Sequence, residues 1–506
     1  MERTCAKTIR LDKLDNVAVA LEDLPAGSLV EGGFRLRESV PTGHKVALCD
    51  IAESGALRKY GQVIGFASRE IRQGDHVHLQ NLEMKEVARD HAIGAERRQT
   101  NLVAVLDRAS FSGIIRPDGR AATRNYLGVL ATVNCSASVA RMIADQFKDL
   151  SPYPNLDGVV ALGHGSGCCM IPGGEAHRLL QRSLAGYARH PNFAGVVLVG
   201  LGCEVNQLEG LMQDMGLKNL PNIIGVDIQE AGGTRETIRR GVEAVNSLIP
   251  LATGVKRQPV SAEHLVLGLE CGGSDAYSGI TANPALGVAA DLLVSQGGTV
   301  ILSETPEIYG AEHLLTRRAG SREAGEKLLA RIRWWEDYTA RNGGSIDNNP
   351  SPGNKAGGIT NVWEKSLGAV AKAGSTNLIE VYQYAEEIRT SGLVFMDTPG
   401  YDVVSITGMV AGGANMVCFT TGRGSVFGCK PVPVVKIASH TPLYKRMPDD
   451  IDFNCGVVID GAMSLQEAGE SIFRMLLEAA SGVKTLSEVQ GMGDMEFVPW
   501  HLGAVT

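Results

Sequence analysis

The sequence is poor in the features that mark several large protein classes. Only 5% of its 506 residues are aromatic, which argues against a protein that binds bases or sugar chains by stacking. No segment reaches the ~18–20 uncharged apolar residues of a membrane helix, and the charged N-terminus lacks the apolar core of a signal peptide. Lys and Arg total 48 against 56 Asp and Glu, without a long basic block. We therefore expect a cytoplasmic protein with no nucleic-acid and no membrane partner.

The glycine motifs of nucleotide-binding enzymes are also missing. Neither GxGxxG nor GxxxxGK[ST] follows the first predicted strand, which argues against a nucleotide-dependent α/β enzyme. Glycine itself is abundant, at 61 residues, and it clusters after apolar runs, where tight turns and close backbone approach to ligands occur. The ten cysteines are expected to be reduced in the cytoplasm, which leaves packing, catalysis or metal binding as their roles.

Hydrophobic periodicity divides the chain into three structured parts and a linker. Short β segments with turns fill residues 1–85 and predict a small all-β module. Residues 86–112 are charged and weakly patterned, which predicts a linker or strap. In residues 113–255 apolar runs alternate with helical patterns, which predicts a parallel, doubly wound sheet. Residues 256–506 repeat this alternation and include a long Gly/Pro/Asn loop at 343–361.

Four of the predicted strands run directly into a cysteine. These cysteines are Cys135, Cys168, Cys203 and Cys271. Ligands bind at the carboxyl edge of open α/β sheets, and adjacent strands lie ~4.8 Å apart, so the thiols are predicted to converge on one centre. Thiolates bind iron, zinc or iron–sulfur clusters, and His164 offers an imidazole nearby. Packing is the alternative, because free cysteine often behaves as a small buried hydrophobe.

Three further segments place charged groups after predicted strands. The NPSPGNKAGG loop at 349–358 presents backbone amides, Asn354 and Lys355 to an anion. Arg423 lies between two glycines in TTGRG and suits bidentate binding of a carboxylate. Glu304, at another strand end, is a candidate base or metal ligand. The alternatives are a surface loop, a surface turn and a helix cap, respectively.

Histidines in the β module form another candidate group. His44 lies in a Gly-His-Lys turn, and His76 and His78 alternate along one predicted strand, which places their side chains on the same face. Such a pair binds metal or carboxylate in other proteins, and plain surface positions are the alternative.

Several of these motifs match one known family. They are DNVA at 15–18, GHKVAL at 43–48, RPDGR at 116–120, GLGCE at 200–204, CGGSD at 271–275, NPSPGNKAGG and TTGRG. Together they make the chain resemble the altronate/galactarate dehydratase family along nearly its whole length. The segment from Ser303 to Glu312 is closer to the altronate type, whereas the stretch from His164 to Cys169 departs from both types and leaves the substrate open.

The resemblance implies a fold and an activity. The implied fold is a small N-terminal all-β module of the SAF-type β-clip, followed by two α/β regions with mostly parallel sheets. The implied activity is that of a hydro-lyase that removes water from an altronate-like or galactarate-like sugar acid to give a 2-keto-3-deoxy acid. The family is iron-activated, so the expected cofactor is Fe²⁺ or an iron–sulfur cluster, with Mn²⁺ as a substitute. We also expect a homodimer.

These expectations assign roles to individual residues. We expect metal-assisted abstraction of the proton next to the carboxylate, with His44, Glu304 and Lys355 as catalytic residues. The expected substrate contacts are Ser274, Asp275, Asn354, Lys355 and Arg423. The expected metal ligands are Cys135, His164, Cys168, Cys203 and Cys271. Two alternatives remain open: a non-catalytic sugar-acid-binding protein, and a C–S lyase similar to the sulfolactate sulfo-lyases, which are usually split into two chains.

Overall fold

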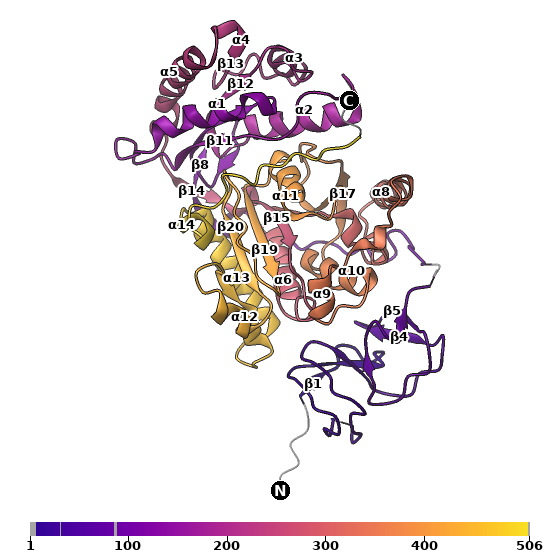
Figure 1. Ribbon diagram of the computed structural model, residues 1–506. Coiled ribbons are helices and arrows are strands. Elements are labelled where there is room, and N and C mark those ends of the chain that lie inside the picture. The colour runs from indigo at the N-terminus through magenta and orange to yellow at the C-terminus, as the bar shows by residue number, and fades with distance from the viewer. Residues whose placement is uncertain (1–6, 31, 86–88, 504–506) are drawn as a thin grey trace.

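The N-terminal module consists of short antiparallel strands. The computed structural model describes residues 7–30, 32–85 and 89–503 and shows this module at one end of the molecule (Figure 1). Its two sheets have the orders β1-β2-β3-β6 and β4-β5-β7. The strands are β1 (Thr8–Ile9), β2 (Val17–Ala20), β3 (Lys45–Ala47), β4 (Ala56–Lys59), β5 (Gln62–Ala67), β6 (His76–Val77) and β7 (Leu82–Glu83). No helix forms in the described part of residues 7–85.

A strap and a small sheet connect the module to the rest of the chain. The strap hydrogen-bonds along the C-terminal domain, where the amides of Gly94 and Glu96 donate to the carbonyls of Thr316 and Arg317. An antiparallel sheet of order β14-β8-β9 follows. Its strands are β8 (Ser110–Ile115), β9 (Ala121–Ala122) and β14 (Gln258–Ser261). The chain therefore enters and leaves the middle domain through neighbouring strands.

The middle domain is a doubly wound α/β unit with a four-stranded parallel sheet of order β11-β10-β12-β13. Its elements are β10 (Tyr126–Ala131), α1 (Asn134–Ala144), β11 (Gly158–Leu162), α2 (Glu175–Ala188), β12 (Phe193–Gly200), α3 (Leu208–Asp214), β13 (Ile223–Asp227), α4 (Ile228–Ala231) and α5 (Thr234–Thr253). Helices α1 and α5 share one apolar cluster with the sheet, and α2 belongs to another that continues into the C-terminal domain. All eight residues of β12 are buried, as expected for a central parallel strand.

The C-terminal domain has a seven-stranded parallel sheet of order β17-β18-β16-β15-β19-β20-β21. The strands are β15 (Val266–Cys271), β16 (Thr299–Leu302), β17 (Leu378–Tyr382), β18 (Gly392–Met396), β19 (Met416–Thr421), β20 (Val434–Ala438) and β21 (Phe453–Asn454). The helices are α6 (Ala282–Ser295), α7 (His313–Thr316), α8 (Arg322–Arg341), α9 (Pro352–Ala356), α10 (Val362–Val370), α11 (Asp402–Ala411), α12 (Thr441–Arg446), α13 (Leu465–Ala480) and α14 (Leu486–Val489). Helices α6 and α13 pack in one apolar cluster with the sheet, and α11 packs with α2 in another.

The strand order creates one crevice at the edge of each parallel sheet. Strand β15 lies between β16 and β19, and β10 lies between β11 and β12. In each case the chain winds first to one side of the central strand and later to the other. Ligands bind at such switch points, outside the carboxyl ends of the strands. Each α/β domain therefore offers one such position.

The predicted fold class is confirmed, and two local predictions change. The segment 343–361 contains α9, which begins with a capping box between Ser351 and Asn354 and has Pro352 at its first position. The segment HVHLQ is a strand only over its first two residues, because the Asn81 side chain bonds to the backbone of His76 and His78 and closes a turn.

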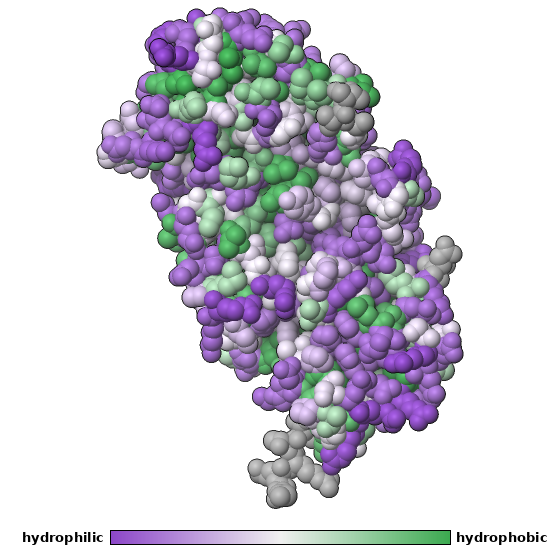
Figure 2. All heavy atoms as spheres, in the orientation of Figure 1, coloured by the Kyte–Doolittle hydropathy of each residue, from purple (hydrophilic) through white to green (hydrophobic). Residues whose placement is uncertain are grey.

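The surface is polar in most places. On the face shown in Figure 2, hydrophobic residues form scattered patches among hydrophilic ones. Among the described residues, none of the helices combines the length and the apolar composition needed to cross a membrane.

Candidate functional site

A group of acidic side chains, buried except for the half-buried Asp402, surrounds the end of β15. Glu270 and Cys271 close this strand, Glu304 and Glu307 follow β16, and Asp402 is the first residue of α11. Glu270 and Glu304 are fully buried. Ligating atoms of Cys271, Glu304 and Glu307 lie within 4.8 Å of one another, and so do those of Glu270, Glu304 and Asp402. The switch point of the larger sheet therefore holds four carboxyl groups and a thiol.

Glu304 is the most unusual member of this group. Its backbone is in the left-handed region at φ 65°, which a non-glycine residue rarely adopts. It precedes a turn of 3₁₀ helix (Thr305–Glu307) without capping it, and neither carboxyl oxygen has a hydrogen-bond partner. Burial, reinforced by the charges of Glu270 and Glu307, raises the pKa of Glu304 well above its usual range. Strain and an unsatisfied buried group persist mainly where function requires them.

Two lysines face the acidic group. Lys365 Nζ lies 2.6 Å from Glu307 and donates a 2.9 Å hydrogen bond to Asn349. Burial favours a neutral Glu307, but the charges of Lys365 and Lys372 outweigh it and lower the pKa of Glu307. Burial raises the pKa of the Cys271 thiol to about 11, and this thiol donates to Glu307 over 3.5 Å.

Asp402 is the carboxyl group with a raised pKa that also lines the open cavity beside the group. Burial, together with the charges of Glu270 and Glu307, raises the pKa of Asp402 to about 7. The Asp402 carboxylate also needs space, since a Cβ on Gly272 would lie 2.1 Å from one of its oxygens. The glycine after Cys271 is thus required by a close approach of the carboxylate.

A cavity of about 370 Å³ opens onto this group. Its lining residues are Cys271, Gly272, Gly273, Glu307, Asn348, Asn349, Ser351, Asn354, Lys365, Gly400 and Asp402. The volume is within the range of sites for small molecules. The cavity thus joins the CGGSD strand end, the NPSPGNK loop and the acidic group.

The β-clip module is anchored beside this cavity by buried charges. Glu364 on α10 accepts hydrogen bonds from Lys45 and Lys59 at 2.9 Å each, and from Thr360. All three charged side chains are at most 1% exposed. Burial alone would raise the pKa of Glu364, but the two lysine charges outweigh it and hold that pKa far below its usual range.

His44, His76 and His78 meet in the module close to α9. Their ring centroids are 4.6–5.7 Å apart, and His44 Nδ1 lies 3.0 Å from His76 Nε2. His44 Nε2 lies 3.4 Å from the carbonyl of Ala356, the last residue of α9. Burial lowers the pKa of all three, to about 4 for His76 and about 3 for His78. These imidazoles are neutral at pH 7.

Some of the predicted substrate contacts are already hydrogen-bonded within the protein, and others form no ion pair in the part of the chain that the structure describes. Asn354 Nδ2 donates to the backbone of Ser274, which is itself buried, and Asn354 Oδ1 accepts from Ser351. Asp275 accepts from Ser278 and Ser439. Lys355 is half-buried and Arg423 is exposed, and within the described chain neither forms an ion pair.

The predicted metal ligands belong to two different sheets. Cys135, Cys168 and Cys203 follow β10, β11 and β12, and all three are exposed. Cys271 ends β15 in the other sheet and is buried. The single centre expected from four neighbouring strands is therefore divided, because the fourth strand belongs to another domain. His164 donates through Nε2 to the carbonyl of Ala131 and accepts from the amide of Ser166, so both ring nitrogens are occupied.

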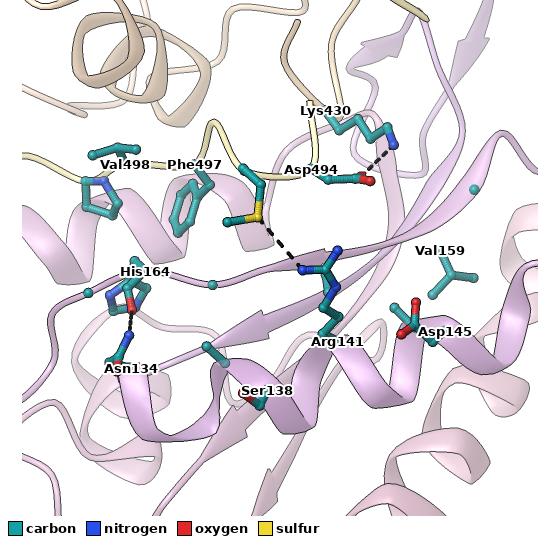
Figure 3. Close-up of a pocket in the computed structure, with 18 of the residues that line it drawn as sticks. Asn134, Ser138, Arg141, Asp145, Val159, His164, Lys430, Asp494, Phe497 and Val498 are labelled. Carbon is teal, nitrogen blue, oxygen red and sulfur yellow. Dashed lines mark hydrogen bonds and ion pairs between the residues drawn. The ribbon is translucent and has the colours of Figure 1, made fainter. Parts of the chain in front are cut away.

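A second and larger cavity, of about 750 Å³, lies between α1 and the C-terminal segment (Figure 3). Asn134 and His164 line one end, Arg141 lies near Met495, and Lys430 pairs with Asp494. The acidic side chains on its lining are Asp145 and Asp494. Among the described residues, this cavity therefore has only two acidic side chains on its lining, one of them paired with Lys430. These residues form no dense acidic group like the one around Cys271.

The sequence indicates Glu304 and Cys271 but not four of their partners in the site. These are Glu270, Lys365, Lys372 and Asp402. The signal for the lysines was present: both lie in a mostly apolar segment, VWEKSLGAVAKA, in which a buried lysine needs an acidic partner. Glu270 directly precedes Cys271 at the same strand end. Asp402 had no such signal, since it follows an ordinary Pro-Gly-Tyr turn.

Sequence comparisons place this architecture among known proteins. Residues 6–85 match the altronate/galactarate dehydratase SAF domain, 113–253 the second domain of D-galactarate dehydratase/altronate hydrolase, and 262–505 the D-galactarate/altronate dehydratase C-terminal domain.

Full-length relatives agree with these matches. The chain is 36% identical to altronate dehydratase of Bacillus subtilis, over 94% of this chain and 95% of the relative. It is 37% identical to altronate dehydratase of Escherichia coli, over 95% and 96%. It is also 37% identical to galactarate dehydratase (L-threo-forming) of Escherichia coli, over 97% and 96%. The chain belongs to the altronate/galactarate dehydratase family of hydro-lyases.

Proposed function

We propose that this protein removes water from an aldonic or aldaric acid, of the altronate type first and the galactarate type second, and releases a 2-keto-3-deoxy acid. The observation that carries the proposal is the group of three buried carboxyl groups and the half-buried Asp402 at the end of β15, open to a small-molecule cavity. The relatives named altronate and galactarate dehydratase support the substrate class.

The reaction needs a base beside the carbon next to the substrate carboxylate. Asp402 lines the cavity and has a pKa of about 7, the range in which a general base is effective at neutral pH. In the proposed step Asp402 takes the proton from C2 and returns it to the hydroxyl that leaves C3, so that one water molecule departs. The enol that remains tautomerises to the 2-keto acid.

The donor set of the site fits a divalent metal such as Fe²⁺ or Mn²⁺. Glu304 has two unpartnered buried oxygens, and ligating atoms of Cys271, Glu304 and Glu307 lie within 4.8 Å of one another, close enough to share one ion. The site has four carboxyl groups and two lysines, so the lysines cannot neutralise all of the carboxylates that a cation would meet. Such a metal, when bound, stabilises the negative charge that develops on the substrate carboxylate and α-hydroxyl. Glu304 must lose its proton to serve as a ligand, so binding is expected to weaken as the pH falls.

Residues around the cavity position the reacting groups. Lys365 and Asn349 hold Glu307 in place. Arg423 approaches Gly273 on the cavity wall, since a Cβ on this glycine would lie 3.2 Å from Arg423 Cβ. We assign Arg423 and Lys355 to the substrate carboxylates, and His44 to the placement of α9 against the cavity.

The test is a panel of C5–C6 sugar acids, assayed for keto-acid product with Fe²⁺ under reducing conditions. We expect product from altronate or galactarate with wild-type protein and with Glu326→Gln, an exposed control. Glu304→Gln should form almost none. Absence of product from every acid, or full activity of Glu304→Gln, would reject the proposal.

A further inference from the structure

The exposed thiols of the molecule gather at one place. Of the five exposed cysteines that the structure describes, four follow the strands of the middle domain, namely Cys135, Cys168, Cys169 and Cys203. Free cysteine is usually among the most buried residue types. Four exposed thiols at the carboxyl edge of one parallel sheet therefore need an explanation other than packing.

Hydrogen bonds tie the three loops that carry these thiols into one unit. Asn134, beside Cys135, donates from its side chain to the carbonyl of His164 and from its amide to that of Ser166 (Figure 3). The amide of Asn206, three residues after Cys203, donates to Gly167. These bonds lie one to four residues from each cysteine.

The loops also approach one another closely. A Cβ on Gly167 would lie 2.6 Å from the carbonyl of Thr132, so the residue before Cys168 is in contact with the end of β10. Glu204, beside Cys203, is buried and accepts from the Thr132 hydroxyl and the Gly202 amide. The Asn206 side chain donates to the Thr132 carbonyl, and its Oδ1 is buried without a partner.

The spacing of the sulfurs argues against a single metal ion. Zinc–thiolate bonds are about 2.3 Å long, so two sulfurs on one ion are at most roughly 4.6 Å apart. No three ligating atoms of these four described cysteines lie within 4.8 Å of one another. Thiolates that share several iron atoms need not lie so close together, and such clusters are held by cysteine.

We propose that Cys135, Cys168 and Cys203 hold an iron–sulfur cluster at the switch point of the middle domain. The three cysteines come from three successive strand ends, and β10 and β12 form the crevice where the winding reverses. Cys169 is a fourth exposed thiol beside Cys168, and its backbone is in the left-handed conformation at φ 56°. This site is separate from the carboxylate group around Glu304 and does not depend on the proposed reaction.

The test is the iron and acid-labile sulfide content of full-length protein, purified without oxygen and reconstituted with Fe²⁺ and sulfide. Wild type should bind iron and sulfide in equal amounts and show visible charge-transfer absorption. Cys135→Ser, Cys168→Ser and Cys203→Ser should each lose about nine-tenths of the sulfide, whereas Cys49→Ser, exposed in the β-clip module, should lose none. Glu304→Gln should keep its sulfide even when it has lost activity.

A second measurement needs no variant. In the reconstituted wild type, Cys135, Cys168 and Cys203 should be protected from alkylation while Cys49 reacts, as read by mass spectrometry. Iron bound without sulfide, equal sulfide in all four serine variants, or equal alkylation of all exposed thiols would overturn the proposal.

Discussion

The two α/β domains place their polar chemistry at equivalent positions and treat it in opposite ways. In the C-terminal domain the strand end is covered by α9, α10 and the β-clip module; three of its four carboxyl groups are buried and Asp402 is half-buried. In the middle domain the corresponding edge is open and carries exposed thiols. Topology therefore fixes where each site lies, whereas burial determines which groups have shifted pKa values and which are accessible to solvent.

The difference depends on the long connection between β16 and β17 of the C-terminal domain. Helix α9 is inserted between β16 and β17, and the backbone of Gly358 passes the β-clip module at Gly43, where a Cβ would lie 2.3 Å from a carbonyl oxygen. The middle domain has no comparable insertion among its described residues. The β-clip module thus contributes to enclosing only one of the two edges.

The largest expected effect is that of Glu304→Gln on catalysis. This change keeps the shape of the side chain but removes its ability to ionise. We expect kcat to fall by about 10³-fold, since acid–base and electrostatic groups contribute about 10²–10⁴-fold. The measurement is steady-state keto-acid formation beside Glu326→Gln. A fall in kcat of less than tenfold would show that the reaction does not depend on this acidic group.

The next effect concerns the anchoring of the β-clip module. Glu364→Gln leaves Lys45 and Lys59 buried without a counter-charge. Removing one partner of a buried ion pair costs about 3–5 kcal/mol, so urea unfolding should shift by a corresponding amount. Glu326→Gln should leave the unfolding free energy nearly unchanged. Equal stability of both variants would show that the buried charges do not hold the module.

Asp402 should determine the pH dependence of the reaction. With a pKa of about 7, Asp402 is ionised above this pH and protonated below it, so kcat/KM of the wild type should rise between about pH 6 and 8. Asp402→Asn should lower kcat/KM by about 10²-fold and abolish this rise. A variant that keeps the same pH profile would exclude Asp402 as the base.

Arg423 should affect substrate binding more than chemistry. Loss of a charge-assisted hydrogen bond costs about 1.5–3 kcal/mol, so Arg423→Gln should raise KM for the sugar acid by about tenfold or more with kcat within twofold. Arg333→Gln, which changes an exposed arginine on α8, is the control. A fall in kcat at unchanged KM would contradict a role in carboxylate binding.

The smallest effect is an acid sensitivity of the histidine group. Burial lowers the pKa of His76 to about 4 and that of His78 to about 3, whereas unfolded histidine titrates near 6.5. Between pH 6.5 and 4 the unfolded chain binds more protons, so stability should fall as the pH is lowered through this range. Melting temperatures at pH 7 and 5 should differ less in the His76→Gln/His78→Gln double variant than in the wild type. If the difference in melting temperature between pH 7 and 5 is the same in both proteins, the acid sensitivity arises from other groups.

The sequence predicts the fold class and the strand ends well, because periodicity and glycine placement are local signals. It also identifies Glu304 as a candidate and Cys271 at a strand end. It cannot assign strands to sheets, and for this reason Cys271 was grouped with three thiols of another domain. The roles of Lys365, Lys372 and Asp402 depend on burial and on long-range contacts, which no local pattern contains. Asn354 lines the cavity and Asp275 lies two residues after Gly273 on its wall, but their hydrogen bonds inside the protein were not predictable.

The most direct test of the central claim is to locate the bound metal. Crystals grown without oxygen with Mn²⁺ and a sugar acid, in a Cys135→Ser/Cys168→Ser/Cys203→Ser background, would give an anomalous signal at the ion. The account predicts a peak about 2.0–2.6 Å from carboxylate oxygens of Glu304 and Glu307, with the sugar acid in the adjoining cavity beside Asp402. A peak at the histidine group of the β-clip module, or a sugar acid bound in the cavity beside α1, would contradict it.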